Sequence, residues 1–156
     1  MTDWKVGDVV GRLERTMTAE RMRWHVEGLD IAAGEAPARA AVNFHTDDDS
    51  ARANGLPGRI ADGMVTTNWL SSLLVAAFGD AVLWGATMRA KFIKPVFEGD
   101  RVEARVTVTA VEEDGEGART IHTELRCDNQ HGELCTIGAA VVTLGPDGRA
   151  RYGARP

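Results

Sequence analysis

Residues 63–78 read GMVTTNWLSSLLVAAF, and this stretch decides the fold. Apolar residues occupy nearly every side of the helical wheel that it forms. A helix that is apolar all round has to be largely surrounded by protein. Asp62 stands at the N-cap position and Gly79 follows the last turn, so both ends of the helix are signalled. The sequence therefore predicts one long, buried helix at the centre of the molecule.

Alternating patterns after this helix predict the strands of a sheet. Residues 101–110 alternate strictly between Val or Ala and polar side chains, which is typical of a half-buried strand. A weaker alternation follows over residues 121–127. Residues 134–144 are apolar on both faces, as in a strand that is covered on both sides or lies at a subunit interface. With residues 82–94 as a further strand, we expect four consecutive strands in an antiparallel meander. This predicts an α+β fold in which an antiparallel sheet curls around the central helix.

The first 60 residues predict shorter elements. Residues 7–10 lead into a short strand, and Thr18 begins a helix that runs to about Gly28. Residues 30–39 are rich in Ala, Gly and Pro, which predicts a loop. A short helix, capped by Asp47, is expected to end near Gly55. No repeat or linker divides the sequence, so we expect residues 1–156 to form a single domain.

Composition and charge exclude several classes of protein. The length of 156 residues suits one domain, and 44% apolar with 26% charged residues excludes a disordered chain. The longest apolar run, residues 73–78, is far shorter than the roughly 20 residues of a membrane helix. A net charge of −5 opposes binding to phosphate backbones, so nucleic acid is not an expected partner. Asp3, Lys5 and Asp8 interrupt any secretory signal, so we expect a cytoplasmic protein.

The two cysteines are expected to be reduced thiols. Cys127 and Cys135 flank a short segment of turn composition, so they should face each other, or lie diagonally, across a β-hairpin. Thiols stay reduced in the cytoplasm. The spacing of a zinc site is missing from the sequence around them, and we therefore expect no metal.

Three spaced motifs carry the chemical signal. Residues 43–47 read NFHTD, residues 51–64 read ARANGLPGRIADGM, and residues 92–100 read FIKPVFEGD. Together they resemble the signature of the MaoC-like dehydratases, a hot-dog-fold family that includes (R)-specific enoyl-CoA hydratases. In that family an N-P-x-H-x-D element precedes an A-x-x-x-G turn and an I-A-H-G-M start of the central helix, and F-x-x-P-V-x-x-G-D follows. The resemblance extends over roughly residues 6–144.

The resemblance implies a homodimer of hot-dog subunits with the active site in a tunnel at the dimer interface. It implies an acyl thioester of coenzyme A or of a carrier protein as the substrate, with no further cofactor. The expected enzyme is a lyase that hydrates a 2-enoyl thioester or dehydrates an (R)-3-hydroxyacyl thioester. Adding water to such a double bond requires a base for the water, a proton donor for Cα and hydrogen bonds to the enolate-like oxygen.

Three residues are expected to meet these demands. We assign Asp62 as the base, His45 as its acid/base partner and the Gly63 N–H as the donor to the oxyanion. Amides at a helix N-terminus are unpaired and lie at the positive end of the helix dipole, which also favours an ionised Asp62. A capping carboxylate uses the second or third amide and leaves that of Gly63 free. The alternatives are an ordinary cap, a histidine that only holds its loop and a glycine needed only for close packing.

Two departures from the family motif affect the acid/base groups. The family has an aspartate five residues before its histidine, where this chain has Ala40. Asp30, in a G-L-D sequence similar to the family's G-D, is the candidate for a displaced catalytic acid. Asp62 stands where the family usually has histidine. The acid/base groups are therefore rearranged relative to the family.

Four further residues are candidates for substrate binding, each with a structural alternative. Asn43 orients the nearby histidine or binds substrate, or else it forms a local turn. Ser71 contacts the acyl chain, or it bonds back to a helix carbonyl. Arg89 and Lys94 meet the phosphates of coenzyme A, or they belong to a solvated strand face.

Two other functions remain open at this level. A cyclase, isomerase or thioesterase on the same scaffold would use Asp62 and His45 on a specialised biosynthetic intermediate. A non-catalytic hot-dog subunit, or a small-molecule binding module, would need no acid/base pair, and the missing family aspartate favours this alternative.

Overall fold

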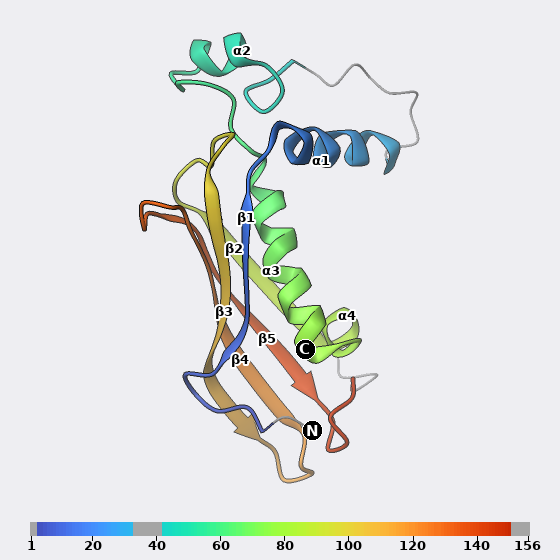
Figure 1. Cartoon of the computed structure of the whole chain (residues 1–156). Helices are drawn as coiled ribbons and strands as arrows, with labels where there is room; N and C mark the ends of the chain where they lie inside the picture. The colour runs from blue at the N-terminus through green and yellow to red at the C-terminus, as the bar shows by residue number, and fades with distance from the viewer. Residues whose placement is uncertain (1–2, 33–41, 151–156) are drawn as a thin grey trace.

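The computed structural model describes residues 3–32 and 42–150, with the side chains of all of these except residues 27–32. Figure 1 shows one curled sheet with the long helix α3 against one of its faces and with α1 and α2 beyond the N-terminal end of that helix. The elements in chain order are β1 (Val9–Thr16), α1 (Ala19–Ala32), α2 (Asp48–Ala53), α3 (Gly63–Phe78), α4 (Ala81–Gly85), β2 (Ala86–Phe92), β3 (Arg101–Glu113), β4 (Arg119–Asp128) and β5 (Leu134–Leu144). The predicted α+β fold is confirmed.

The sheet has five antiparallel strands in the order β1-β3-β4-β5-β2. The predicted four-stranded meander is therefore only partly right. Strands β3, β4 and β5 do follow one another, but β2 pairs with β5 and not with β3. The place beside β3 belongs to β1, which the sequence signals only weakly. An alternating pattern identifies a strand but not the strand with which it pairs. The pairing depends on which edge of the sheet is not already occupied by another strand.

The core lies between α3 and the sheet. The alternating apolar residues of β3 are buried on one face of that strand, as predicted, and they belong to the same cluster as Leu70 and Leu74 of α3. Leu70 and Leu74 are 0% and 1% exposed. Burying one such leucine stabilises the fold by about 1.5–3 kcal/mol. This packing places the N-terminal end of α3 beside β5 and the segment that follows β2.

The predicted bounds of α3 are confirmed. Asp62 caps the helix, because its Oδ1 accepts the N–H of Met64 at 2.8 Å. Gly79 ends it with a φ of +60°, a conformation that favours glycine. The expectation that the helix is surrounded is wrong for the single chain, since Met64 is 46% and Val75 39% exposed. The sheet covers only one side of α3. Within the described residues, no helix is long and apolar enough to cross a membrane.

Helix α1 is longer than the sequence predicts, whereas α2 begins where it was expected. Helix α1 runs to Ala32, so Asp30 lies in a helix and not in the predicted loop. Gly28 does not end the helix, because one interior glycine costs only about 1 kcal/mol relative to alanine. Helix α2 is confirmed with its predicted cap, since Oδ1 of Asp47 accepts the N–H of Ser50 at 2.7 Å.

The two cysteines lie near the turn between β4 and β5. Cys127 is opposite Thr136, so Cys135 is diagonal to it, as one of the two predicted arrangements has it. Both thiols are buried and free. Burial raises the pKa of Cys127 to about 12.

Candidate active site

A cavity of about 400 Å³ lies at the N-terminal end of α3. It brings together His45, Asp62, Gly63 and Lys94, which are four of the residues predicted from the sequence. They come from the loop before α2, the first turn of α3 and the segment after β2. The rest of the wall is mainly apolar and includes Leu56, Ile60, Phe92, Pro95 and Val96. A mainly apolar cavity with a few converging polar groups is typical of a small-molecule site.

The loop that carries His45 is held by a turn built on Asn43. Oδ1 of Asn43 accepts the N–H of His45 at 2.8 Å, and its carbonyl accepts the N–H of Thr46 at 3.0 Å. The ring nitrogen Nδ1 of His45 lies 3.0 Å from the carbonyl oxygen of Ile60. Since a carbonyl only accepts hydrogen bonds, we assign the proton of the neutral ring to Nδ1. Nε2 is then the nitrogen that can take up a proton.

Asp62 and Gly63 combine a helix cap with an open amide. The carboxylate takes the second amide of α3, that of Met64, as the sequence predicts. The N–H of Gly63 makes no hydrogen bond within residues 3–32 and 42–150. It therefore remains available to an oxygen atom in the cavity.

Close packing also requires glycine at position 63. A Cβ atom built there would lie only 2.5 Å from the ring of Phe92. Any side chain would have to displace that ring, which supports the packing alternative considered for Gly63. The two properties are compatible because the ring meets the Cα side of the residue, whereas the amide N–H is unpaired.

A buried hydrogen bond ties the first turn of α3 to the sheet. Thr66 and Thr136, each 1% exposed, have their hydroxyl oxygens 3.0 Å apart. The Thr66 hydroxyl also lies 2.8 Å from the carbonyl of Gly63. We infer that this pair fixes the position of the Gly63 amide. The sequence analysis missed it, because the pairing of β5 with β2 decides which strand faces Thr66.

Several predicted site residues lie elsewhere. Asn43 builds the loop but does not line this cavity, and Ser71 lies further along α3, outside the cavity. Arg89 is exposed on β2 and does not line it either. Asp30 is in α1, and its side chain and the whole of Ala40 lie outside the described residues.

Lys94 lies at the exposed edge of the cavity. Its ammonium group donates a hydrogen bond to Glu133, and this bond lowers the pKa of the Glu133 carboxyl. An anionic ligand at this edge would compete with Glu133 for the lysine. Within the part of the chain that the structure describes, His, Cys, Asp and Glu form no group of three that could hold a metal ion.

His25 is a residue that the sequence analysis did not select. It lies on α1, and its Nε2 is 3.8 Å from Oδ1 of Asp62. The two residues are 37 positions apart, and no motif links them. Only the packing of α1 against the start of α3 brings them together.

Comparison with known proteins shows the family and the fold. The family described as "MaoC like domain" matches residues 43–129, more than half of the chain, and this span contains His45, Asp62 and Gly63. The chain belongs to the MaoC-like domain family. The resemblance that the motifs suggested is therefore confirmed, including the hot-dog fold.

Relatives of this MaoC-like domain match it over most of its length. It is 27% identical, over 143 residues, to the mitochondrial 3-hydroxyacyl-[acyl-carrier-protein] dehydratase of Arabidopsis thaliana, with 92% of this chain and 78% of the relative covered. The solved structure of an (R)-hydratase from A. caviae involved in PHA biosynthesis is similar with a TM-score of 0.68 and 27% identity, covering 91% of this chain and 98% of that one. A MaoC-like dehydratase from Rhodospirillum rubrum shares the fold, with a TM-score of 0.67, 23% identity and coverage of 92% and 94%.

Proposed function

We propose that this MaoC-like domain hydrates a 2-enoyl thioester or, in reverse, dehydrates an (R)-3-hydroxyacyl thioester. The observation that carries the proposal is the convergence of an unpaired helix amide, a carboxylate and an imidazole on one cavity. The relatives named above are a hydratase and dehydratases, which supports this reaction over cyclisation, isomerisation or thioester hydrolysis.

Each of the three groups has one task in the proposed hydration. The thioester oxygen accepts a hydrogen bond from the Gly63 N–H, which stabilises the negative charge that develops there. The Asp62 carboxylate takes a proton from water while the water oxygen bonds to Cβ. The electron pair of the double bond moves toward the thioester oxygen, and protonated His45 then delivers a proton to Cα. Proton exchange between His45, Asp62 and solvent restores the starting state.

We further propose that the substrate is carried by coenzyme A or by a carrier protein. Lys94 supports this assignment, because it places a positive charge at the edge of the cavity that holds Asp62 and Gly63. Both carriers present phosphate, and a lysine ammonium attracts phosphate as a point charge. Kinetics with enoyl thioesters of the two carriers will identify the preferred one.

A homodimer is the assembly that we propose for this chain. Strand β2 forms one edge of the sheet, and apolar residues are exposed on or near it, including Phe92 and Ile93. The uncovered side of α3 adds Met64 and Val75. An open strand edge with apolar neighbours is suited to pairing with a second chain.

The decisive experiment is the loss of the conjugated enoyl absorbance when the purified protein is given crotonyl-CoA. We expect hydration by the wild type and a loss of about 10²–10⁴-fold in kcat/KM in H45A, because general acid/base groups contribute that much. The matched control is H131A, which removes an exposed histidine outside the cavity. An inactive wild type with both enoyl-CoA and enoyl carrier protein, or an H45A variant with normal activity, would contradict the proposal. An inactive wild type would favour the non-catalytic subunit that the missing family aspartate suggested.

A further inference from the structure

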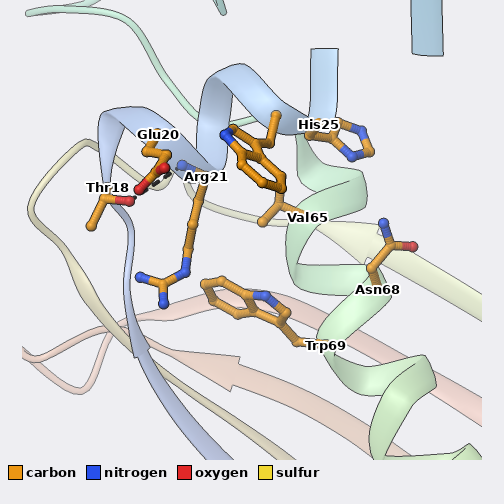
Figure 2. A pocket seen from close by; sticks show the side chains of 8 residues that line it. Thr18, Glu20, Arg21, His25, Val65, Asn68 and Trp69 are labelled. Carbon is orange, nitrogen blue, oxygen red and sulfur yellow. Dashed lines mark hydrogen bonds between the residues drawn. The ribbon is translucent and has the colours of Figure 1, made fainter. Parts of the chain in front are cut away.

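The His25 imidazole is almost buried and is not used in the mechanism above. Its side chain is 13% exposed, and its Nε2 has no hydrogen-bond partner in the part of the chain that the structure describes. Figure 2 shows the ring extending from α1 toward the first turns of α3. A buried polar atom without a partner is destabilising, so its neighbours should explain it.

Among the described side chains, Asp62 is the acid in ion-pair contact with this ring. Nε2 of His25 lies 3.8 Å from Oδ1 of Asp62, whose side chain is 29% exposed. This distance exceeds the 2.7–3.2 Å of an ordinary N–H···O hydrogen bond. Hydrogen bonds of catalytic groups are often long in ligand-free sites and shorten when substrate binds. The two groups are therefore within ion-pair distance, and a hydrogen bond between them requires a closer approach.

The contact links two cavities that are both lined by residues from the first turns of α3 or its cap. Asp62 lines the cavity that contains Gly63, and His25 lines a second cavity of about 480 Å³ between α1 and α3. The imidazole is not part of the wall of the cavity that contains Gly63, where the substrate is proposed to bind. In that place it can orient the carboxylate without touching the reacting atoms.

We propose that His25 is a positioning residue for Asp62. Its Nε2–H and the N–H of Met64 both donate to Oδ1, and this leaves Oδ2 to take the proton from water. The inference rests on the proposed hydratase function. It makes α1 part of the acid/base machinery in a chain that has Ala40 where the family has its catalytic aspartate.

Kinetics of variants at both positions test the inference. H25F removes the donor while keeping a ring of similar size, and H25Q keeps an N–H at a similar reach. We expect H25F to lower kcat about 10-fold or more, with KM changed less than about 2-fold, and H25Q to recover most of the loss. In a D62N background, H25F should have no further effect, because His25 acts only through the carboxylate.

The matched control is H122F. His122 also has a buried Nε2 without a hydrogen-bond partner among residues 3–32 and 42–150, and this atom lies 3.4 Å from Glu112. It is on β4 and lines neither cavity. H122F should keep the wild-type kcat. A normal kcat in H25F, no recovery in H25Q, or an additional loss in the double variant would overturn the inference while leaving the hydratase function intact. An inactive wild type would instead contradict the proposed function itself.

Nitrogen NMR of the imidazoles supplies a test that does not depend on the folding of any His25 variant. With a 3-hydroxyacyl-CoA product bound, we expect Nε2 of His25 to carry a proton and its resonance to shift in D62N. An unprotonated Nε2, or a resonance that D62N leaves in place, would overturn the inference.

Discussion

Asp62 combines a structural and a chemical property in one side chain. As a cap it binds the Met64 amide, and as a wall of the cavity it meets the proposed substrate. Capping is the ordinary role of an aspartate in this position, and by itself it indicates no activity. The contact with His25 and the place of Asp62 in the cavity wall distinguish this cap from that of Asp47 on α2.

Substitution of Asp62 should separate the two properties. Asparagine caps helices as well as aspartate does, so we expect D62N to keep the free energy of unfolding within about 0.5 kcal/mol and to lose kcat about 10²–10⁴-fold. D62A should lose the same activity and, in addition, about 1 kcal/mol of stability. Urea unfolding and crotonyl-CoA kinetics measure the two effects. A fully active D62N would rule out Asp62 as the base.

The Cys127 thiol should make the stability of the protein fall in alkaline solution. Burial raises its pKa from 9.0 to about 12, so between these pH values the unfolded chain releases a proton that the folded chain retains. Its contribution to stability is thus fully present below pH 9 and is lost as the pH rises toward 12. We expect the loss of stability between pH 8 and 11 to be smaller in C127A than in the wild type. Equal pH dependence in both proteins would contradict this.

At the scale of elements, a buried hydrogen bond links the first turn of α3 to the sheet. The hydroxyls of Thr66 and Thr136 link α3 to β5 beneath the cavity. Replacing one partner leaves the other hydroxyl buried, although Thr66 keeps its bond to the Gly63 carbonyl. Replacing both leaves no unpaired group at this contact.

A double-mutant cycle measures this contact. We expect T66V, which leaves the Thr136 hydroxyl without its partner, to cost about 1–3 kcal/mol of unfolding free energy. T136V should cost less, about 0.5–1.5 kcal/mol, because Thr66 keeps its bond to the Gly63 carbonyl. The double variant should cost less than the sum of the two, because each single variant removes the same bond. Strictly additive losses in urea unfolding would show that the two hydroxyls do not interact.

The lengths of the other elements show where local signals are weak. Asp47 and Asp62 are strong caps, and both helices begin at the predicted positions. Gly28 is a weak stop signal, and α1 continues past it. The propensity of one residue changes a helix by about 1 kcal/mol or less, so packing decides the outcome.

At the scale of the whole molecule, the open edge of β2 is the place where a second chain would pair. The Ile93 N–H donates to the carbonyl of Cys135. In an antiparallel pair, every second residue of a strand directs its N–H toward the partner strand. The N–H of Ala90, three residues earlier, therefore points away from β5.

Substitution of this residue should disrupt the dimer without disturbing the β2–β5 pair. Proline is tolerated on edge strands whose N–H faces outward, but it removes a donor from any strand added there. By light scattering we expect the wild-type protein to have twice the 16.8 kDa mass of one chain. The dissociation constant of the A90P dimer should be at least about 10-fold higher. A90V keeps the donor and should remain dimeric. A monomeric wild type, or an equally stable A90P dimer, would contradict this interface.

Local sequence signals are sufficient to predict the central helix and both of its ends, and they include the three spaced motifs. The cap that Asp62 forms before Gly63, and the alternating burial along β3, each depend on residues only a few positions apart in the chain. Patterns of this kind can be recognised from the sequence. Only the tertiary structure decided that β2 pairs with β5, that Thr66 meets Thr136 and that His25 reaches Asp62. These contacts join residues far apart in the chain. The free energy that stabilises these contacts comes from burying surface between several elements. It therefore cannot be predicted from the sequence of any one segment.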